Sequence, residues 1–357
     1  MCPPEDWRAQ AHWGGSVAES RRQLLHELTG LISPSVMIPD RRLAHLFDQV
    51  KQGQINNCLY HNTAASPSLY AEHMCERDDF PLRTLAELKA HSDEVWCLRF
   101  SNDGTKLASA SKDRSVLIWD AYTHALLKRL PEHEKEVTNL AWSPDDTKLI
   151  SCSMDQRARV WEVSTGKRLV TAEHSKPATA ASWAPDGLSF ITSTMEKTTS
   201  ICHWSAAALN FGSLLHTISG GFRAQDCAIS PDGQRIIAAD NACHLHVFNA
   251  SSYEKEYEKD VTQRLTCVTV SQDSQHLLVS CGNGELQLLE LETGELVRSF
   301  QGHQQGSLII RNCFGGAAEN FVLSGSEGMS PYQSNVFILT RHRQQNLRMA
   351  QRERHVD

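Results

Sequence analysis

The stretch AHSDEVWCLRFSNDGTKLASASKDRSVLIWD, residues 90–120, decides the fold of this chain. It predicts three short strands, at residues 95–100, 106–110 and 115–119. The segment NDG at residues 102–104 predicts a hairpin turn between the first two strands, because Asn and Gly accept a positive φ at little steric cost. A meander of three short strands cannot bury both of its faces alone, so we expect it to stack against copies of itself.

A second copy follows at residues 133–161, HEKEVTNLAWSPDDTKLISCSMDQRARVW, and it aligns without a gap. The period is 42 residues, measured from one His to the next. Four residue types recur at fixed offsets, as His91, Ser101, Asp113 and Trp119 and then as His133, Ser143, Asp155 and Trp161. A gapless match of this length indicates a repeat architecture in which neighbouring units bury each other.

Four later units keep the turn but lose most of the other shared residues. Unit three ends at Trp204 with two extra residues before it and no turn Asp, and Gly220 stands at the His position of unit four. Replacing a whole polar network by apolar residues is tolerable, whereas a half-replaced network is costly. We therefore expect units three to six to be held mainly by packing.

The two regular units resemble the WD-repeat family, whose period is about 40–45 residues and whose blades are four-stranded sheets around a central channel. The resemblance implies an all-β propeller over residues 82–340 with six recognisable repeats. A last strand is expected at residues 336–339. Two arrangements stay open: an incomplete seven-bladed ring, and a six-bladed ring in which an outer strand at residues 82–88 completes the sixth blade.

The resemblance also implies a hydrogen-bonded chain of four side chains in each regular blade. Its members are His91, Ser109, Asp113 and Trp119 in the first blade, and His133, Ser151, Asp155 and Trp161 in the second. Each of these groups loses hydration on burial and finds a partner in the next. His, Asp and Ser in one network would also fit a hydrolytic triad, but the set repeats and an enzyme needs one site, which favours a structural role.

The amino-terminal part predicts helices. Residues 1–18 show no apolar period, and we expect them to be disordered. Apolar residues at helical spacing predict one helix from residue 19 to about residue 32 and a second over residues 40–52. Two short amphipathic helices cannot shield each other, so they must pack on the propeller or on another protein.

A closer resemblance rests on ISPSVMIPDRRLAHLFDQVKQGQINNCLYHN at residues 32–62 and on RNCFGG at residues 311–316. These segments resemble the WD-repeat subunits of CTLH/GID E3 ubiquitin-ligase complexes. The resemblance implies that residues 19–62 are a helical CRA-like remnant without the preceding LisH and CTLH helices, and that the last repeat is missing. Residues 63–81 are then a linker, and residues 341–357 form a basic tail without a counterpart in that family.

Composition narrows the function classes. A net charge of −7 and a pI near 6.2 argue against nucleic acid or an anionic membrane as partner. The eleven cysteines are scattered without a C-x-x-C pair, which indicates reduced thiols in the cytosol or nucleus. We find no run of about 18 apolar residues and expect no transmembrane helix.

Signs of catalysis are missing from the sequence. We find no nucleophile with a positioned base, no paired acids and no metal cluster, so we expect neither an enzyme nor a cofactor. His244 and His246 lie on one face of a predicted strand, where a metal could use them. Because no third ligand is evident nearby, the sequence favours a packed or solvated pair and predicts no metal site.

The leading hypothesis, implied by the resemblance, is a non-catalytic scaffold or substrate-recruiting subunit of a CTLH/GID-type ubiquitin ligase in the cytoplasm and nucleus. The amino-terminal helices would dock on CTLH and RING subunits, and the propeller face would hold client proteins. The face residues predicted from the loops beside the His and Asp positions are Asp93, Glu94, Trp96, Lys112, Lys135, Glu136 and Met154. An ordinary solvated rim is the alternative for these residues, except that Trp96 is expected to act as an aromatic anchor only if exposed, and a ring wedged between blades is the favoured alternative for it. For the chain, the alternative is a general WD-repeat adaptor in G-protein-type signalling or in another ubiquitin-ligase assembly.

Overall fold

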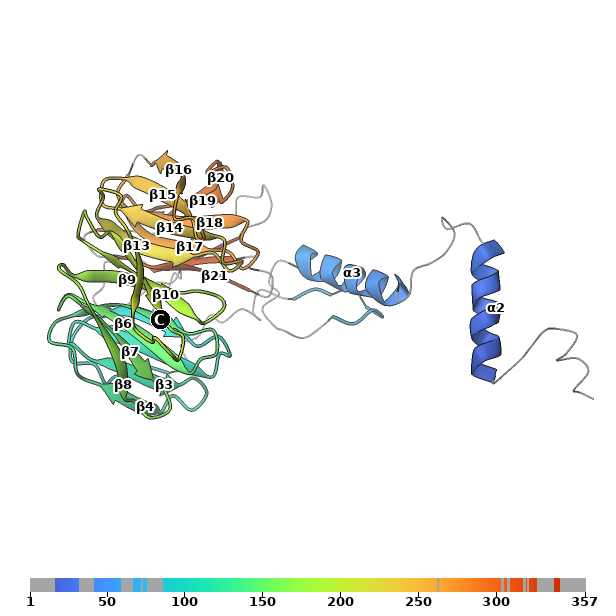
Figure 1. Ribbon diagram of the computed structural model, residues 1–357, viewed down its shortest axis with the longest axis horizontal. Helices are drawn as coiled ribbons and strands as arrows, with labels where there is room; N and C mark the ends of the chain where they lie inside the picture. Colours follow the sequence, from blue (N-terminus) through green and yellow to red (C-terminus); the bar gives the residue numbers. More distant parts are fainter. Residues whose placement is uncertain are drawn as a thin grey trace, which may run out of the picture. The chain divides into compact units, whose positions relative to one another are not determined.

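The computed structural model of the 357-residue chain separates a helical unit from a larger unit built of strands (Figure 1). The smaller unit comprises Met1–Cys58 and Ala65–Met74, and the larger comprises Leu59–Ala64 and Cys75–Asp357. The structure describes residues 17–31, 42–58, 67–71, 73–75, 86–261, 263–302, 305–306, 309–316, 319, 321–325 and 337–340.

The described helices of the smaller unit are α2 (Val17–Leu31) and α3 (Arg42–Asn57). Helix α2 begins inside the segment predicted to be disordered, of which residues 1–16 lie outside the described part of the chain. Helix α3 begins two residues later than predicted and continues five residues beyond the predicted end. It passes through Gly53, although a glycine in a helix interior costs about 1 kcal/mol relative to alanine.

Five four-stranded antiparallel meanders follow one another along the larger unit, one for each of the first five predicted repeats (Figure 1). Blades one and two consist of β1 (Val95–Phe100), β2 (Lys106–Ser111), β3 (Val116–Asp120), β4 (Leu126–Leu130), β5 (Val137–Trp142), β6 (Lys148–Ser153), β7 (Arg157–Glu162) and β8 (Arg168–Glu173). Blades three and four consist of β9 (Ala178–Trp183), β10 (Ser189–Thr194), β11 (Ile201–Ser205), β12 (Leu214–Ile218), β13 (Ala224–Ile229), β14 (Arg235–Asp240), β15 (His244–Asn249) and β16 (Lys255–Asp260). Blade five consists of β17 (Leu265–Val270), β18 (His276–Cys281), β19 (Glu285–Glu290) and β20 (Leu296–Gln301).

The sixth repeat gives a three-stranded sheet of β21 (Asn312–Gly315), β22 (Phe321–Ser324) and β23 (Phe337–Thr340). The last of these lies one residue beyond the expected strand. In the segment expected to add an outer strand, residues 86–88 form no strand, and residues 82–85 lie outside the described part. The described residues therefore hold five complete blades, and the closure of the ring stays a prediction.

One type of turn closes the first hairpin of every repeat. The backbone N–H of the fourth turn residue donates to the carbonyl of the first, over 2.8 Å in blade four and 3.0 Å in blade one. This fourth residue has a positive φ in all six repeats, where it is Gly104, Asp146, Gly187, Gly233, Ser274 and Glu319. A positive φ is unfavourable for Asp, Ser and Glu, but the hydrogen-bonded hairpin around these residues holds the backbone in that conformation.

Successive turns also contact each other. The carboxylate of Asp146 accepts the backbone N–H groups of Asn102 and Asp103 in the preceding blade, each over 2.8 Å. Pro144 and Pro185 stand at the second position of their turns, where they supply no backbone N–H. In the turns that follow them, the fourth residue is a glycine, Gly187 and Gly233. A Cβ on Gly233 would lie 3.2 Å from the ring of Pro185, so the close approach as well as the positive φ favours glycine there.

The apolar core lies between consecutive blades. Ile118 of blade one and Leu140 of blade two belong to one buried cluster, and Leu278 of blade five shares another with Val322 of the sixth sheet. Burying a side chain of this size contributes about 1.5–3 kcal/mol. Each blade therefore depends on its neighbour, as the repeat pattern predicts.

A buried polar contact joins sheets that are far apart in sequence. The guanidinium of Arg311, just before β21, donates to the carbonyl of Thr138 over 3.2 Å and lies 3.4 Å from the carboxylate of Asp226. These residues belong to the sixth sheet, blade two and blade four. The inner strands therefore meet around a common centre.

Candidate functional site

In blade one the four predicted network residues come together. His91 Nδ1 lies 2.9 Å from Asp113 Oδ2, and His91 Nε2 lies 2.8 Å from Ser109 Oγ, which also accepts the indole N–H of Trp119 over 3.0 Å. The chain is satisfied when Nδ1 carries the imidazole proton. Burial opposes the charge of Asp113, but the hydroxyl of Ser115 and His91 lower the pKa of this carboxyl well below its usual range.

Blade two repeats the chain and adds a cation. His133 lies 2.9 Å from Asp155 and 2.7 Å from Ser151, whose oxygen accepts the indole N–H of Trp161 over 2.8 Å. Arg159, with a side chain 4% exposed, donates to Asp155 Oδ2 over 2.9 Å and also contacts His133. Burial lowers the pKa of His133 despite the neighbouring carboxylate. Blade two thus holds a buried ion pair that blade one lacks.

Blade three keeps part of the polar chain beside its buried apolar residues, and the prediction that packing mainly holds units three to six stays a prediction. His174 Nε2 lies 3.3 Å from Thr192 Oγ1, which accepts the indole N–H of Trp204 over 2.8 Å. Three members of the chain are therefore kept, and only the turn carboxylate is lost. Glu196 lies in the turn, but its carboxylate accepts a hydrogen bond from Ser175 instead. Without an anionic partner, burial lowers the pKa of His174 to about 4.

These chains connect Asp, His and Ser in the order of a hydrolytic triad, but their serines are not accessible to a substrate. The residues Ser109 and Ser151 are 2% and 0% exposed. The hydroxyl oxygen of each already accepts an indole N–H. A nucleophile needs access to substrate as well as a base. The arrangement can cross-link the strands of a blade, and its buried hydroxyls do not reach a cleft.

The predicted face residues of blade one form a small group in which Asp93 and Glu94 are exposed and Trp96 and Lys112 are partly buried. Lys112 Nζ lies 3.9 Å from Asp93 and 3.6 Å from Glu94, and the indole N–H of Trp96 donates to Glu94 over 3.2 Å. In blade two, the backbone N–H of Met154 donates to the carbonyl of Glu136, as that of Lys112 does to Glu94. Lys135, Glu136 and Met154 therefore occupy the equivalent loop and turn of the next blade. Such polar and amphipathic groups on a rigid frame suit protein binding.

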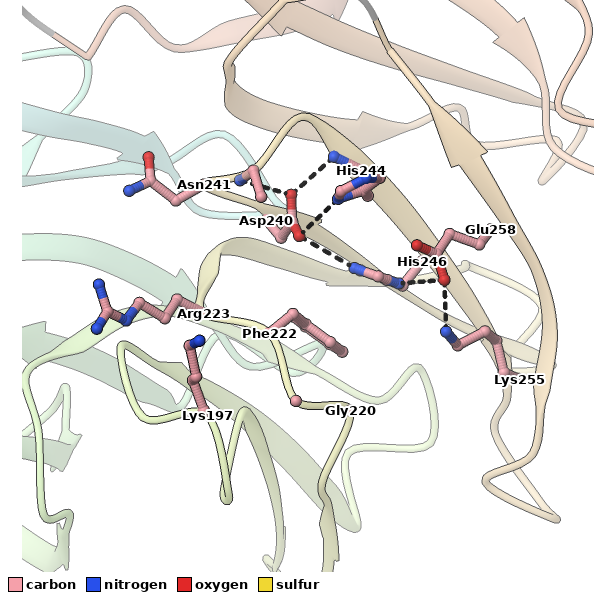
Figure 2. A pocket seen from close by; sticks show the side chains of 12 residues that line it. Lys197, Gly220, Phe222, Arg223, Asp240, Asn241, His244, His246, Lys255 and Glu258 are labelled. Carbon is pink, nitrogen blue, oxygen red and sulfur yellow. Dashed lines mark hydrogen bonds and ion pairs between the residues drawn. The ribbon is translucent and has the colours of Figure 1, made fainter.

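A cavity of about 460 Å³ opens on blade four, beside the turn that links β14 to β15 (Figure 2). In it Asp240 Oδ2 lies 3.1 Å from His244 Nδ1 and 3.4 Å from His246 Nε2. The prediction that the two imidazoles have no third ligand nearby is therefore wrong, because Asp240 supplies a third donor atom. Asp240 lies four residues before His244, at the end of β14, and the β14–β15 turn brings them together.

The electrostatics of this cavity are uneven. Hydrogen bonding to Asp240 raises the pKa of His244, whereas burial lowers the pKa of His246. Burial opposes the charge of Asp240, but the backbone N–H and the ring of His244 lower the pKa of its carboxyl. A hydrogen bond from Lys255 lowers the pKa of Glu258. At neutral pH the cavity therefore holds ionised carboxylates beside a neutral buried imidazole.

A family model described as the IFT122 first beta-propeller matches residues 82–330. The chain is also 33% identical to the WD repeat-containing protein WDS homolog of Arabidopsis thaliana, over 90% of this chain and 62% of that protein. The chain belongs to the WD-repeat β-propeller family.

Two further relatives of this WD-repeat chain carry more specific names. It is 35% identical to GID complex subunit 7 of Schizosaccharomyces pombe, over 86% of the chain and 61% of that protein. It is 33% identical to the WD repeat-containing protein 26 homolog of Arabidopsis thaliana, over 89% of the chain and 54% of that protein. The chain therefore spans less than two thirds of the length of these relatives.

Reasoning from the sequence of this WD-repeat protein misses two groups. Thr192 follows His174 at the same offset at which Ser109 follows His91, and a search for any hydroxyl at that offset would have found it. Asp240 would have been found by extending the pair of histidines to the spacing Asp-x-x-x-His-x-His. Among the helices that the structure describes, none has both the length and the apolar character that crossing a bilayer requires.

Proposed function

We propose that this WD-repeat chain is a non-catalytic scaffold or client-recruiting subunit of a CTLH/GID-type E3 ubiquitin ligase. The observation that carries the proposal is the similarity to GID complex subunit 7, which extends over 86% of the chain. In such a ligase the transfer chemistry belongs to RING partners, and this chain supplies binding surfaces. The proposed location is that of the assembly, in the cytoplasm and nucleus.

The helical unit supports a role in assembly. Leu25 of α2 and Leu43 of α3 are each 63% exposed, and Phe47 and Val50 of α3 are about half exposed. Apolar side chains that gather on a short helix need a partner surface, because isolated helices of this length are marginal in water. We assign this surface, part of the proposed CRA-like remnant, to docking on the helices of CTLH and RING subunits.

The propeller supports a role in client binding. Asp93, Glu94, Trp96 and Lys112 form a group, exposed at its two carboxylates and partly buried at Trp96 and Lys112, that combines both charges with an aromatic ring. Aromatic side chains at the centre of such a group often carry most of the binding free energy. We assign this group and its equivalents in blade two, Lys135, Glu136 and Met154, to the face that holds client proteins.

The test is affinity purification of the full-length chain from cells, followed by mass spectrometry. Phe47→Ser is expected to lower recovery of CTLH and RING subunits about tenfold or more, while Gln49→Ser on the same helix leaves it unchanged. Trp96→Ala combined with Lys112→Glu is expected to lose clients and to keep the ligase subunits. Absence of CTLH and RING subunits from the parent sample would refute the proposal. Recovery of G-protein subunits or another ligase would favour the general adaptor instead.

A further inference from the structure

Three donor atoms converge in the cavity of blade four (Figure 2). Asp240 Oδ2, His244 Nδ1 and His246 Nε2 all lie within 4.8 Å of one another. A tetrahedral zinc ion with bonds of about 2.0–2.1 Å places its ligands roughly 3.3 Å apart. The observed separations from Asp240 Oδ2, 3.1 Å and 3.4 Å, bracket this value. By contrast, the His–Asp hydrogen bonds of blades one and two are both 2.9 Å.

The two oxygens of Asp240 have different partners, and Oδ2 is the one that contacts the imidazoles. Oδ1 accepts the backbone N–H groups of Ala242 and His244 over 2.8 Å and 2.7 Å. These bonds fix the carboxylate and leave Oδ2 directed at the two rings. The side chains of Asp240 and His246 are 3% and 4% exposed, so the donors are built into the blade, while His244 is 36% exposed at the open side.

Hydrogen bonding alone does not satisfy a neutral imidazole at His246. A neutral imidazole has one N–H, and here its two nitrogens face two carboxylates, Asp240 on one side and Glu258 at 3.5 Å on the other. If Nε2 donates to Asp240, the lone pair of Nδ1 faces Glu258. This Nδ1 atom is buried and has no hydrogen-bond partner. A metal ion on the lone pair of Nε2 places the proton on Nδ1, where it points at Glu258.

The register of β15 and β16 gives both imidazoles a carboxylate behind them. His246 pairs with Glu258 across the strands and His244 pairs with Asp260, whose carboxylate lies 3.5 Å from His244 Nε2. Metal-bound histidines commonly donate their second N–H to a carboxylate, which fixes the tautomer and the ring orientation. Phe222 stacks on His246 with ring centroids 3.9 Å apart and holds the ring further.

The charges around the donor atoms are of both signs. Asp240, Glu258 and Asp260 surround the two imidazoles, and Lys255 pairs with Glu258 over 2.5 Å. Lys197 and Arg223 also line the cavity, so the carboxylates are not in excess over the cavity as a whole. A cation is therefore favoured by the three converging donor atoms and not by net charge.

We propose that Asp240, His244 and His246 bind one divalent ion of the zinc class, with the fourth ligand position open to the cavity. Two imidazoles and one carboxylate are donors that zinc accepts readily. The site lies in blade four alone and does not depend on the proposed ligase function. It holds the turn between β14 and β15 against β16.

The test uses the full chain, stripped with a chelator under reducing conditions and titrated with Zn²⁺ by calorimetry, with metal content measured by mass spectrometry. His244→Gln and Asp240→Asn are each expected to lose one equivalent of zinc, or to weaken its binding more than about 100-fold. Glu258→Gln removes the half-exposed carboxylate beside His246 and is expected to weaken zinc binding about 10–100-fold. In the parent, and not in His244→Gln, zinc should raise the melting temperature.

Two variants control for other donors. His216→Gln removes an exposed imidazole of blade three, and Cys243→Ser removes the thiol next to His244, and both should bind zinc as the parent does. Cobalt in the parent should give visible absorption without the near-ultraviolet band of a thiolate ligand. Equal zinc stoichiometry and affinity in the parent, His244→Gln and Glu258→Gln would overturn the proposal, and the cluster would then be a hydrogen-bond network only.

Discussion

Blades two and four occupy equivalent places in the repeat, yet they use polar residues in opposite ways. Blade two buries a closed chain in which His133, Ser151, Asp155 and Trp161 each meet a partner. In blade four the same positions are Gly220, Ala238, Ala242 and Phe248, so the chain is lost as a unit. The polar residues of blade four stand at other positions of the same hairpin.

The difference teaches where a repeat protein can place a new site. A chain that satisfies all its members leaves no donor atom for a ligand, and removing one member is costly. Once the whole chain is replaced by small and apolar residues, the hairpin is free to carry Asp240, His244 and His246. Gly220 contributes directly, because a Cβ there would collide with the Phe222 ring that stacks on His246.

The largest expected loss of stability comes from removing the aromatic residue on the third strand of blade two, compared with the same change in blade four. Trp161→Ala should lower the free energy of unfolding by about 3–5 kcal/mol, through a cavity and the loss of one of the two hydrogen bonds of the Ser151 hydroxyl. Phe248→Ala removes volume alone and should cost at least about 1 kcal/mol less than Trp161→Ala. Chemical denaturation measures both. Equal losses would mean that the polar chain contributes nothing beyond packing.

A smaller effect separates the two regular blades. Asp155→Asn should destabilise by about 2–4 kcal/mol, because it leaves the buried charge of Arg159 without its partner. Asp113→Asn should cost about 1–2 kcal/mol, because blade one has Leu117 where blade two has Arg159. The double variant Asp155→Asn with Arg159→Leu should recover part of the loss. If it does not, the ion pair is not the cause.

A third expected effect depends on pH and concerns blade three. The pKa of His174 is lowered to about 4, so folding favours the neutral ring. Its contribution to stability is complete above pH 6.5 and is lost progressively as the pH falls from 6.5 to the folded-state pKa of about 4. The parent should therefore lose about 2 kcal/mol more than His174→Gln between pH 7 and pH 5. Parallel stability curves for the two proteins would show that His174 does not titrate in this window.

The local chemistry of the hairpins allowed much of the fold to be predicted from the sequence. The turns at residues 102–104 and their later copies mark every repeat, because a positive φ recurs at one position. His91, Asp113 and their partners could be identified because two units repeat them at fixed offsets. The end of α3 could not be predicted, because interior Gly53 does not stop that helix.

The candidate site of blade four depends on pairing that the sequence does not display. Glu258 and Asp260 come to lie behind His246 and His244 only in the observed register of β15 and β16. A shift of one residue would turn them to the other face of the sheet. The third donor, Asp240, is adjacent only after the hairpin closes. Residues 341–357, predicted to be a basic tail, and the linker residues 63–66 lie outside the described part of the chain.

The contacts between successive turns differ from one pair of blades to the next, which bears on the order in which similar blades pack. Asp146 recognises the two N–H groups of Asn102 and Asp103, whereas Gly187 and Gly233 accommodate the proline rings that precede them. If two blades were exchanged, the carboxylate of Asp146 would face a proline that has no N–H to donate. A glycine would then face the N–H groups of Asn102 and Asp103 and leave them without an acceptor. The contacts between these turns therefore favour the observed order of the blades over an exchanged one.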